Sequence, residues 1–128
     1  MPSKNEVQKA FNKRFETHSS GHIIKLETPC QWKSHILDIE KDAGEIGRIK
    51  YVLYPDRASK TWRIQAVPAE SGSFQSRKPL KEAWRGLRDT ELADKTGVKD
   101  ARFVHHTGFI GGAKSYEGVL KMAVLNLE

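Results

Sequence analysis

The sequence is poor in cysteine, with one among 128 residues, and it has no long apolar run. The lone Cys30 has no partner for an intramolecular disulfide, and one thiol cannot build a zinc site without several other ligands. No stretch approaches the roughly 20 apolar residues of a membrane-spanning helix, and the N-terminal segment lacks the apolar core of a secretory signal. These absences exclude a disulfide-rich secreted domain, a zinc ribbon and a membrane protein. They favour a soluble intracellular protein with no membrane partner.

The charge balance is basic and uneven along the chain. Charged residues make up 30% and hydrophobic residues 38%, as in ordinary folded proteins, and the net charge is 22 − 16 = +6. Four of these six excess charges lie within residues 77–88, where one acidic residue, Glu82, accompanies Arg77, Lys78, Lys81, Arg85 and Arg88. Because charges act on a phosphate mainly within about 8 Å at physiological salt, this clustering favours an anionic partner.

The hydrophobic pattern predicts a single domain over residues 1–128, since no repeat or long linker divides the chain. Helical spacing is found over residues 4–17, 28–42, 89–96 and 115–127. Alternating spacing is found over 22–27, 47–54, 61–67 and 102–106, and the middle two strands should form an antiparallel hairpin. Residues 68–88 are expected to be an irregular loop, and 107–112 a glycine-containing turn. The predicted fold class is α+β, a mostly antiparallel sheet covered by helices and ending in strand, glycine turn and helix.

Two local features of this prediction concern single residues. Thr28 and Pro29 are typical of a helix start, because Thr caps the first turn and Pro needs no N–H there. In the hairpin, apolar side chains alternate on one face, and the opposite face is expected to be polar. The apolar face carries Ile49, Tyr51, Leu53, Trp62, Ile64 and Ala66, and the polar face carries Arg48, Lys50, Arg63 and Gln65.

The double glycine before the last helix is the first candidate site. A strand, a glycine turn and a helix start would present unpaired backbone N–H groups to an anion. Gly111 and Gly112 would let a phosphate approach the backbone, and Lys114 would add a full charge. The spacing is not that of a P-loop. The alternative is that the glycines merely turn the chain.

The basic segment 73–88 is the second candidate site. Arg77, Lys78, Arg85 and Arg88 could bind phosphates, since guanidinium groups contact phosphate in two-pronged fashion. Phe74 and Trp84 could stack on bases, each stacked base contributing about 1–3 kcal/mol. The alternative is that the apolar residues of this segment anchor it to the core, a reading that the average burial of Trp favours for Trp84.

Neither catalytic residues nor a metal site is predicted. His105 and His106 point to opposite faces of a regular strand, so they would not bind one metal together. One of them could still face a ligand. A self-sufficient enzyme that uses either histidine as general acid or base is a further possibility, although no carboxylate is placed beside them by sequence.

Four ordered segments resemble the C-terminal half of the melanocyte-proliferating-gene protein family, which is similar to a branch of the DHH phosphoesterases. They are WRIQAVP (62–68), SFQSRKPL (73–80), WRGLRD (84–89) and FVHHTGFIGG (103–112). The resemblance implies a metal-dependent hydrolase that acts as a 3′-to-5′ RNA exonuclease in the nucleus or mitochondrion. It also implies a divalent metal, manganese or magnesium, in an N-terminal catalytic domain.

The chain contains no Asp-His-His run, so that catalytic metal domain is absent from it and no cofactor is expected in this chain. The chain resembles the family's C-terminal substrate-binding domain, which would not be catalytic by itself. Implied partners are single-stranded RNA or an oligonucleotide, and a DHH-type catalytic domain in cis or in trans. The superfamily's glycine motif ends in His, whereas Ala113 follows Gly112 here, so His105 or His106 would have to substitute.

We therefore expect the basic segment and the double glycine to converge on one cavity that holds RNA phosphates. The expected contacts are Arg77, Lys78, Arg85, Arg88, Gly111, Gly112, Lys114, His105 and His106, with Phe74 and Trp84 stacking on bases. The alternative function is a structural or dimerisation module of a hydrolase family, with no direct contact to nucleic acid.

Overall fold

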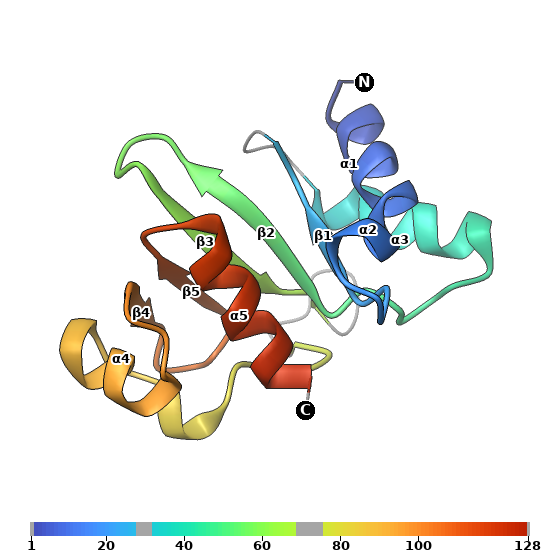
Figure 1. The fold of residues 1–128 in the computed structure, drawn as a ribbon. Coiled ribbons are helices and arrows are strands. Elements are labelled where there is room, and N and C mark those ends of the chain that lie inside the picture. The colour runs from blue at the N-terminus through green and yellow to red at the C-terminus, as the bar shows by residue number, and fades with distance from the viewer. Residues whose placement is uncertain (1, 28–31, 69–75, 128) are drawn as a thin grey trace.

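A five-stranded sheet in the order β1-β2-β3-β5-β4 forms the centre of the protein (Figure 1). The computed structural model describes residues 2–27, 32–68 and 76–127. The strands are β1 Ile23–Lys25, β2 Tyr51–Asp56, β3 Thr61–Ala66, β4 Ala101–Val104 and β5 Ile110–Ala113. The helices are α1 Pro2–Asn12, α2 Arg14–Thr17, α3 Lys33–Ala43, α4 Asp89–Thr96 and α5 Tyr116–Leu127, with a 3-10 turn, η1, at Glu82–Trp84. The α+β class with a mostly antiparallel sheet is confirmed.

The strand pairing is antiparallel except at one edge, where β1 runs parallel to β2. The predicted hairpin is present, and its strands extend to the pair Asp56–Thr61. The connection is therefore shorter than the predicted residues 55–60. In the parallel pair, α3 lies in the crossover between β1 and β2, as parallel strands require.

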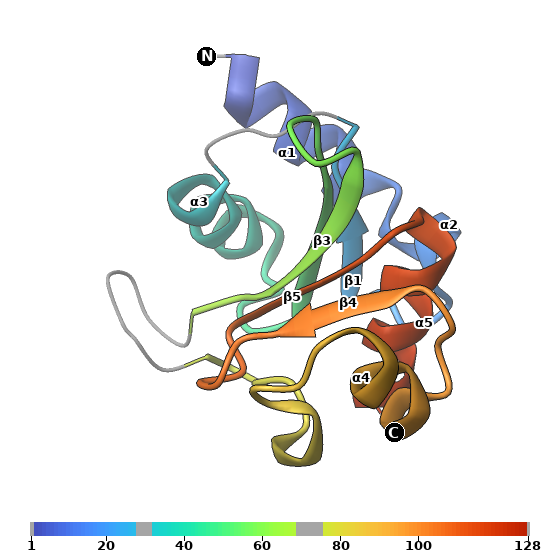
Figure 2. The same ribbon diagram turned by 90° about the vertical axis from the view of Figure 1, so that its left-hand side faces the viewer.

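Helices cover both faces of the sheet, but different parts of it (Figure 2). Helix α5 packs on one face, where Tyr51, Leu53 and Ile64 are fully buried. Helices α1 and α3 pack on the other face over β1 and β2, where the buried residues include Ile24 and Val52. The predicted polar face is thus only partly polar, because this second core covers it at the β1–β2 end. Ile49 belongs to that second core and not, as expected, to the face of Tyr51 and Leu53.

The predicted helices are present with adjusted ends. The helix expected over residues 4–17 is divided at Lys13 into α1 and α2. Residues Thr28 and Pro29 lie outside the described residues, and α3 begins at Lys33. Helix α4 ends as predicted at Gly97, whose φ of 75° is left-handed. The Ser115 hydroxyl accepts the Gly118 N–H at 3.1 Å and caps α5, as expected.

The glycine turn predicted over residues 107–112 is wrong in position. The chain turns over residues 105–108, where the Gly108 N–H donates to the His105 carbonyl at 2.9 Å and Gly108 has a φ of 76°. Residues Ile110–Ala113 form β5, which lies between β3 and β4 inside the sheet. Gly111 and Gly112 are therefore strand residues.

Candidate functional site

Gly111 and Gly112 serve close packing instead of anion binding. Both are buried in β5 and pair with residues of β3 on one side and β4 on the other. Their backbone groups therefore face neighbouring strands and not a bound phosphate. A Cβ on Gly111 would lie 3.1 Å from Leu80 Cδ1, and one on Gly112 would lie 2.8 Å from Phe103 Cε1. The absent side chains make room for Leu80 on one face and Phe103 on the other.

Arg77 is held inside the protein by Glu40 of α3. The guanidinium donates from Nη2 to Glu40 Oε1 at 2.6 Å and from Nη1 to Glu40 Oε2 at 2.8 Å. Nη1 also donates to the Ile49 carbonyl at 2.9 Å, and the Ile49 N–H donates to Glu40 Oε2 at 2.8 Å. The side chains of Arg77 and Glu40 are 7% and 0% exposed. The expected phosphate contact of Arg77 is therefore corrected, because its donors are used within the fold.

The rest of the basic segment runs beside the β4–β5 hairpin. The Leu80 N–H donates to the Gly108 carbonyl, the Gly86 N–H to the Val104 carbonyl, and the Val104 N–H to the Leu87 carbonyl, at 2.8, 2.8 and 3.2 Å. Leu80 and Trp84 are buried in the core, so the anchoring reading of Trp84 is confirmed and its stacking role is corrected. Phe74 lies outside the described residues. Within the described part of this segment, residues 76–88, the group that approaches the double glycine is the Leu80 side chain, so these residues do not form the expected shared cavity there.

The turn between β4 and β5 gathers several of the predicted residues. The His105 and His106 rings lie 4.2 Å apart between centroids, and His105 lies edge-on to Phe109 at 4.8 Å. His105 Nδ1 accepts the Thr107 N–H at 3.2 Å. His106 and Thr107 are exposed, and His105 is half-buried. The histidines therefore lie together at a surface turn. A regular strand would have placed them on opposite faces, as predicted, but β4 ends at Val104.

Arg85 and Lys78 lie next to this turn. Arg85 Nε donates to the Leu80 carbonyl at 3.0 Å and approaches Gly108, where a Cβ would lie only 2.6 Å from it. Lys78 is half-buried and lies two residues before Leu80, whose N–H binds the Gly108 carbonyl. We call Lys78, Arg85, His105 and His106 the turn site. It keeps four of the nine predicted phosphate-binding residues near one another.

A second feature next to the turn site was only partly found from the sequence. Arg63 of β3 lies over the Phe103 ring at 4.7 Å, and Phe103 in turn lies across Gly112. Both side chains are half-buried, and they stand on the sheet face opposite α5. We call Arg63, Phe103 and Gly112 the strand platform. The alternation of β3 indicated Arg63 on this face, but nothing local to the sequence indicated that Phe103 would cover Gly112.

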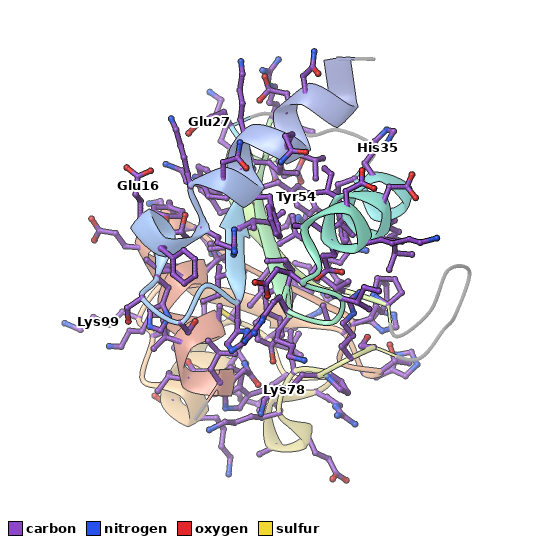
Figure 3. All side chains as sticks on the ribbon, turned by 90° about the vertical axis from the view of Figure 1, so that its right-hand side faces the viewer. Glu16, Glu27, His35, Tyr54, Lys78 and Lys99 are labelled. Atoms are coloured by element: carbon purple, nitrogen blue, oxygen red, sulfur yellow. The ribbon has the colours of Figure 1, made fainter. Side chains whose placement is uncertain are left out.

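Arg63 is positioned by an ion pair at the edge of this platform. Its Nη2 donates to Asp56 Oδ2 at 2.7 Å, and the Ser59 hydroxyl donates to the same oxygen at 2.8 Å. These hydrogen bonds, with that of Arg63 the largest, hold the pKa of Asp56 below its usual value. On the same face, the Tyr54 hydroxyl donates to Gln65 Oε1 at 2.9 Å, and burial raises the pKa of Tyr54. The side chain of Tyr54 is labelled in Figure 3.

Arg88 and Lys114 lie away from the turn site. Arg88 pairs through its backbone with Phe103 beside the middle of β4 and has an exposed side chain. Lys114 follows β5 at the far end of that strand, where its N–H donates to the Asp100 carbonyl at 2.9 Å. Both cations are therefore placed along the β4 side of the sheet, but not in one cavity with the double glycine.

Metal ligands do not gather in the part of the chain that the structure describes: it contains no group of three or more His, Cys, Asp or Glu side chains that could hold a metal ion. In those same residues, no helix is long and apolar enough to span a bilayer.

Comparisons with known proteins give consistent matches over the whole chain. The MYG1 exonuclease model, described as an uncharacterised protein family (UPF0160), matches residues 1–127. The MYG1 exonuclease of Bos taurus is 47% identical over 124 residues, covering 96% of this chain and 32% of that protein. The MYG1 exonuclease of Homo sapiens is 44% identical over 124 residues, covering 96% and 33%. A MYG1 protein of Saccharomyces cerevisiae is 43% identical over 127 residues, covering 99% and 37%.

The chain thus spans about a third of the length of these curated relatives. No solved structure matches it.

Proposed function

The chain belongs to the MYG1 exonuclease family, and from this premise we propose that it is the substrate-binding domain of a nuclease, not catalytic alone. Its substrate would be single-stranded RNA or a short oligonucleotide, held mainly through phosphates. The relatives whose printed name is exonuclease support a nucleic-acid ligand, and the basic character of the chain agrees with one.

The observation that carries this proposal is the turn site. Lys78, Arg85 and the two histidines approach one exposed turn from two segments that are far apart in the sequence. Lys78 and Arg85 place two positive charges beside one turn, and charges gathered in this way attract a phosphate more strongly than the same charges spread over the surface. Arg85 and Lys78 would neutralise backbone phosphates, and the histidines would donate hydrogen bonds to phosphate oxygens.

The strand platform supports a single-stranded ligand over a duplex. The Arg63 guanidinium plane, which lies over the Phe103 ring, can stack on an unpaired base, and base stacking of this kind tolerates any base. Phe103 lies on β4 and His105 directly follows that strand, so the platform and the turn site are adjacent along the chain. We therefore replace the predicted stacking role of Trp84, which is buried, by Arg63 stacked on Phe103.

Catalysis would take place elsewhere. We propose that a divalent metal, manganese or magnesium, is held by a DHH-type catalytic domain, in the same protein or in another chain, and that this domain cleaves the strand held here. A nuclear or mitochondrial location is likewise proposed on the family resemblance alone.

The test is a fluorescence titration of the chain with a labelled octauridylate at two salt concentrations. Binding should weaken as salt rises, with a slope of log K against log salt of about −0.7 for each phosphate neutralised. Lys78→Gln and Arg85→Gln should each reduce that slope by about 0.7, whereas Lys121→Gln, an equal charge change on the exposed side of α5, should leave it unchanged.

Absence of binding by the folded chain at low salt would reject the proposal. Light scattering in the same samples addresses the alternative of a dimerisation module: a stable dimer that does not respond to oligonucleotide would favour that alternative.

A further inference from the structure

Three cations surround a cavity at the start of β4, at the opposite end of that strand from the turn site. The cavity measures about 420 Å³, and Lys99, Arg102 and Lys114 are among the residues that line it. All three side chains are exposed. Figure 3 shows Lys99 pointing away from the protein and well separated from Lys78 of the turn site.

The two acidic residues that line this cavity, Asp89 and Asp100, offset the charge of the three cations only in part. Asp100 Oδ2 accepts the Ser115 N–H at 3.0 Å and the Ser115 hydroxyl at 2.5 Å, so its carboxylate is engaged at the start of α5. Asp89 Oδ1 lies 3.8 Å from Arg102 Nη1, and both side chains are at least half exposed. An exposed ion pair of this kind is weak, so Arg102 can exchange Asp89 for a stronger anion.

The segment between this cavity and the turn site is also cationic. Residues 86–88 pair with β4 through the bonds of Gly86 and Leu87 to Val104, and Arg88 pairs with Phe103. Arg88 therefore lies between the cavity at Arg102 and the turn site at His106. Two steps along β4 separate Arg102 from Val104, a span of about 7 Å at 3.3 Å per residue, and the turn site follows directly after Val104.

From this arrangement we propose that Lys99, Arg102 and Lys114 form a second phosphate-binding site for the same single strand. The strand would run along β4, with one phosphate at the turn site, Arg88 beside its middle and another phosphate at the cavity. The inference rests on the proposed function, and it names a length requirement: a ligand with one phosphate cannot occupy both sites. In this proposal Lys114 still contacts a phosphate, but at the cavity instead of beside Gly111 and Gly112.

The experiment compares two probes, the dinucleoside monophosphate uridylyl-uridine and an octauridylate, on the wild-type chain and on the double variant Lys99→Gln/Lys114→Gln. The variant should lower the magnitude of the salt slope for the octauridylate by about 0.7, the value for the one phosphate that the cavity would hold. Its affinity for uridylyl-uridine should not change. Lys121→Gln serves as the control for loss of charge alone.

A variant in the opposite direction strengthens the test. Asp89→Asn removes the partner of Arg102, and Asn tolerates the left-handed backbone of this position, where φ is 46°. Affinity for the octauridylate should rise, and affinity for uridylyl-uridine should stay constant.

Equal losses for both probes, or no loss for either, would overturn the second site while leaving the proposed function intact. If the wild-type chain binds neither probe at low salt, the proposed function itself fails.

Discussion

Replacing Glu40 by glutamine should destabilise the protein strongly, because it leaves the buried Arg77 without its charge partner. The carboxylate accepts two hydrogen bonds from Arg77 and one from the Ile49 N–H, and neither side chain is more than 7% exposed. Removing one partner of a buried ion pair costs about 3–5 kcal/mol. A small domain is stable by only about 5–15 kcal/mol, so the variant should unfold at a much lower urea concentration.

The measurement is urea denaturation followed by tryptophan fluorescence and by circular dichroism. A lower midpoint with an unchanged m-value indicates lost stability of the same folded state. Glu45→Gln is the matched control, since Glu45 pairs with Arg48 at 2.5 Å on the surface. Its loss should be about 1 kcal/mol or less.

A double variant separates the structural role of Arg77 from a role in binding. Glu40→Met/Arg77→Met removes both buried charges, and such apolar replacements are often neutral or stabilising. It should therefore be more stable than Glu40→Gln and should bind octauridylate as the wild type does. A cost below about 1 kcal/mol for Glu40→Gln, or loss of binding in a folded double variant, would refute this account of Arg77.

Other expected outcomes follow from single contacts. The pKa of Asp56 is held below its usual value. Its contribution to stability is therefore present above about pH 4 and is lost as the pH falls through the folded pKa. In urea unfolding, Asp56→Asn should flatten the acid side of the profile of stability against pH. Gly112→Ala should cost about 1–3 kcal/mol by overpacking, because its Cβ would meet the Phe103 ring at 2.8 Å, and a changed Phe103 ring signal in an NMR spectrum would report the displacement. Asp100→Ala should cost about 0.5–2 kcal/mol through the lost contacts to Ser115 at the start of α5, and an unchanged thermal midpoint would contradict that role.

The sequence predicted those parts of the fold that depend on local pattern. The hairpin of β2 and β3 follows from alternation, and α4 with its Gly97 end follows from helical spacing and the need for a left-handed residue there. Strand β5 could not be predicted in this way. Glycine is depleted in strands, so Gly111 and Gly112 indicated a turn. The reason for their presence lies in the tertiary packing of Leu80, from a distant segment, and of Phe103, from the paired strand β4.

The site was predicted in part for the same reason. The concentration of cations near residue 80 was visible in the sequence, and Lys78 and Arg85 lie near the histidine turn. The burial of Arg77 was not visible, because its partner Glu40 is 37 residues away, on helix α3. A cation in a basic segment can equally serve a phosphate or a buried carboxylate, and only tertiary packing decides between them.

At Gly111 and Gly112 of β5, the packing of the sheet depends on side chains that come from other segments. With no bulk of its own at two successive positions, this strand is covered on one face by Leu80 and on the other by Phe103. The basic segment 73–88 is therefore anchored to the sheet by Leu80. A substitution at Leu80 would loosen the segment together with Lys78 and Arg85, which flank Leu80 in the sequence. Affinity for a polyanion would then fall without the removal of any charged group.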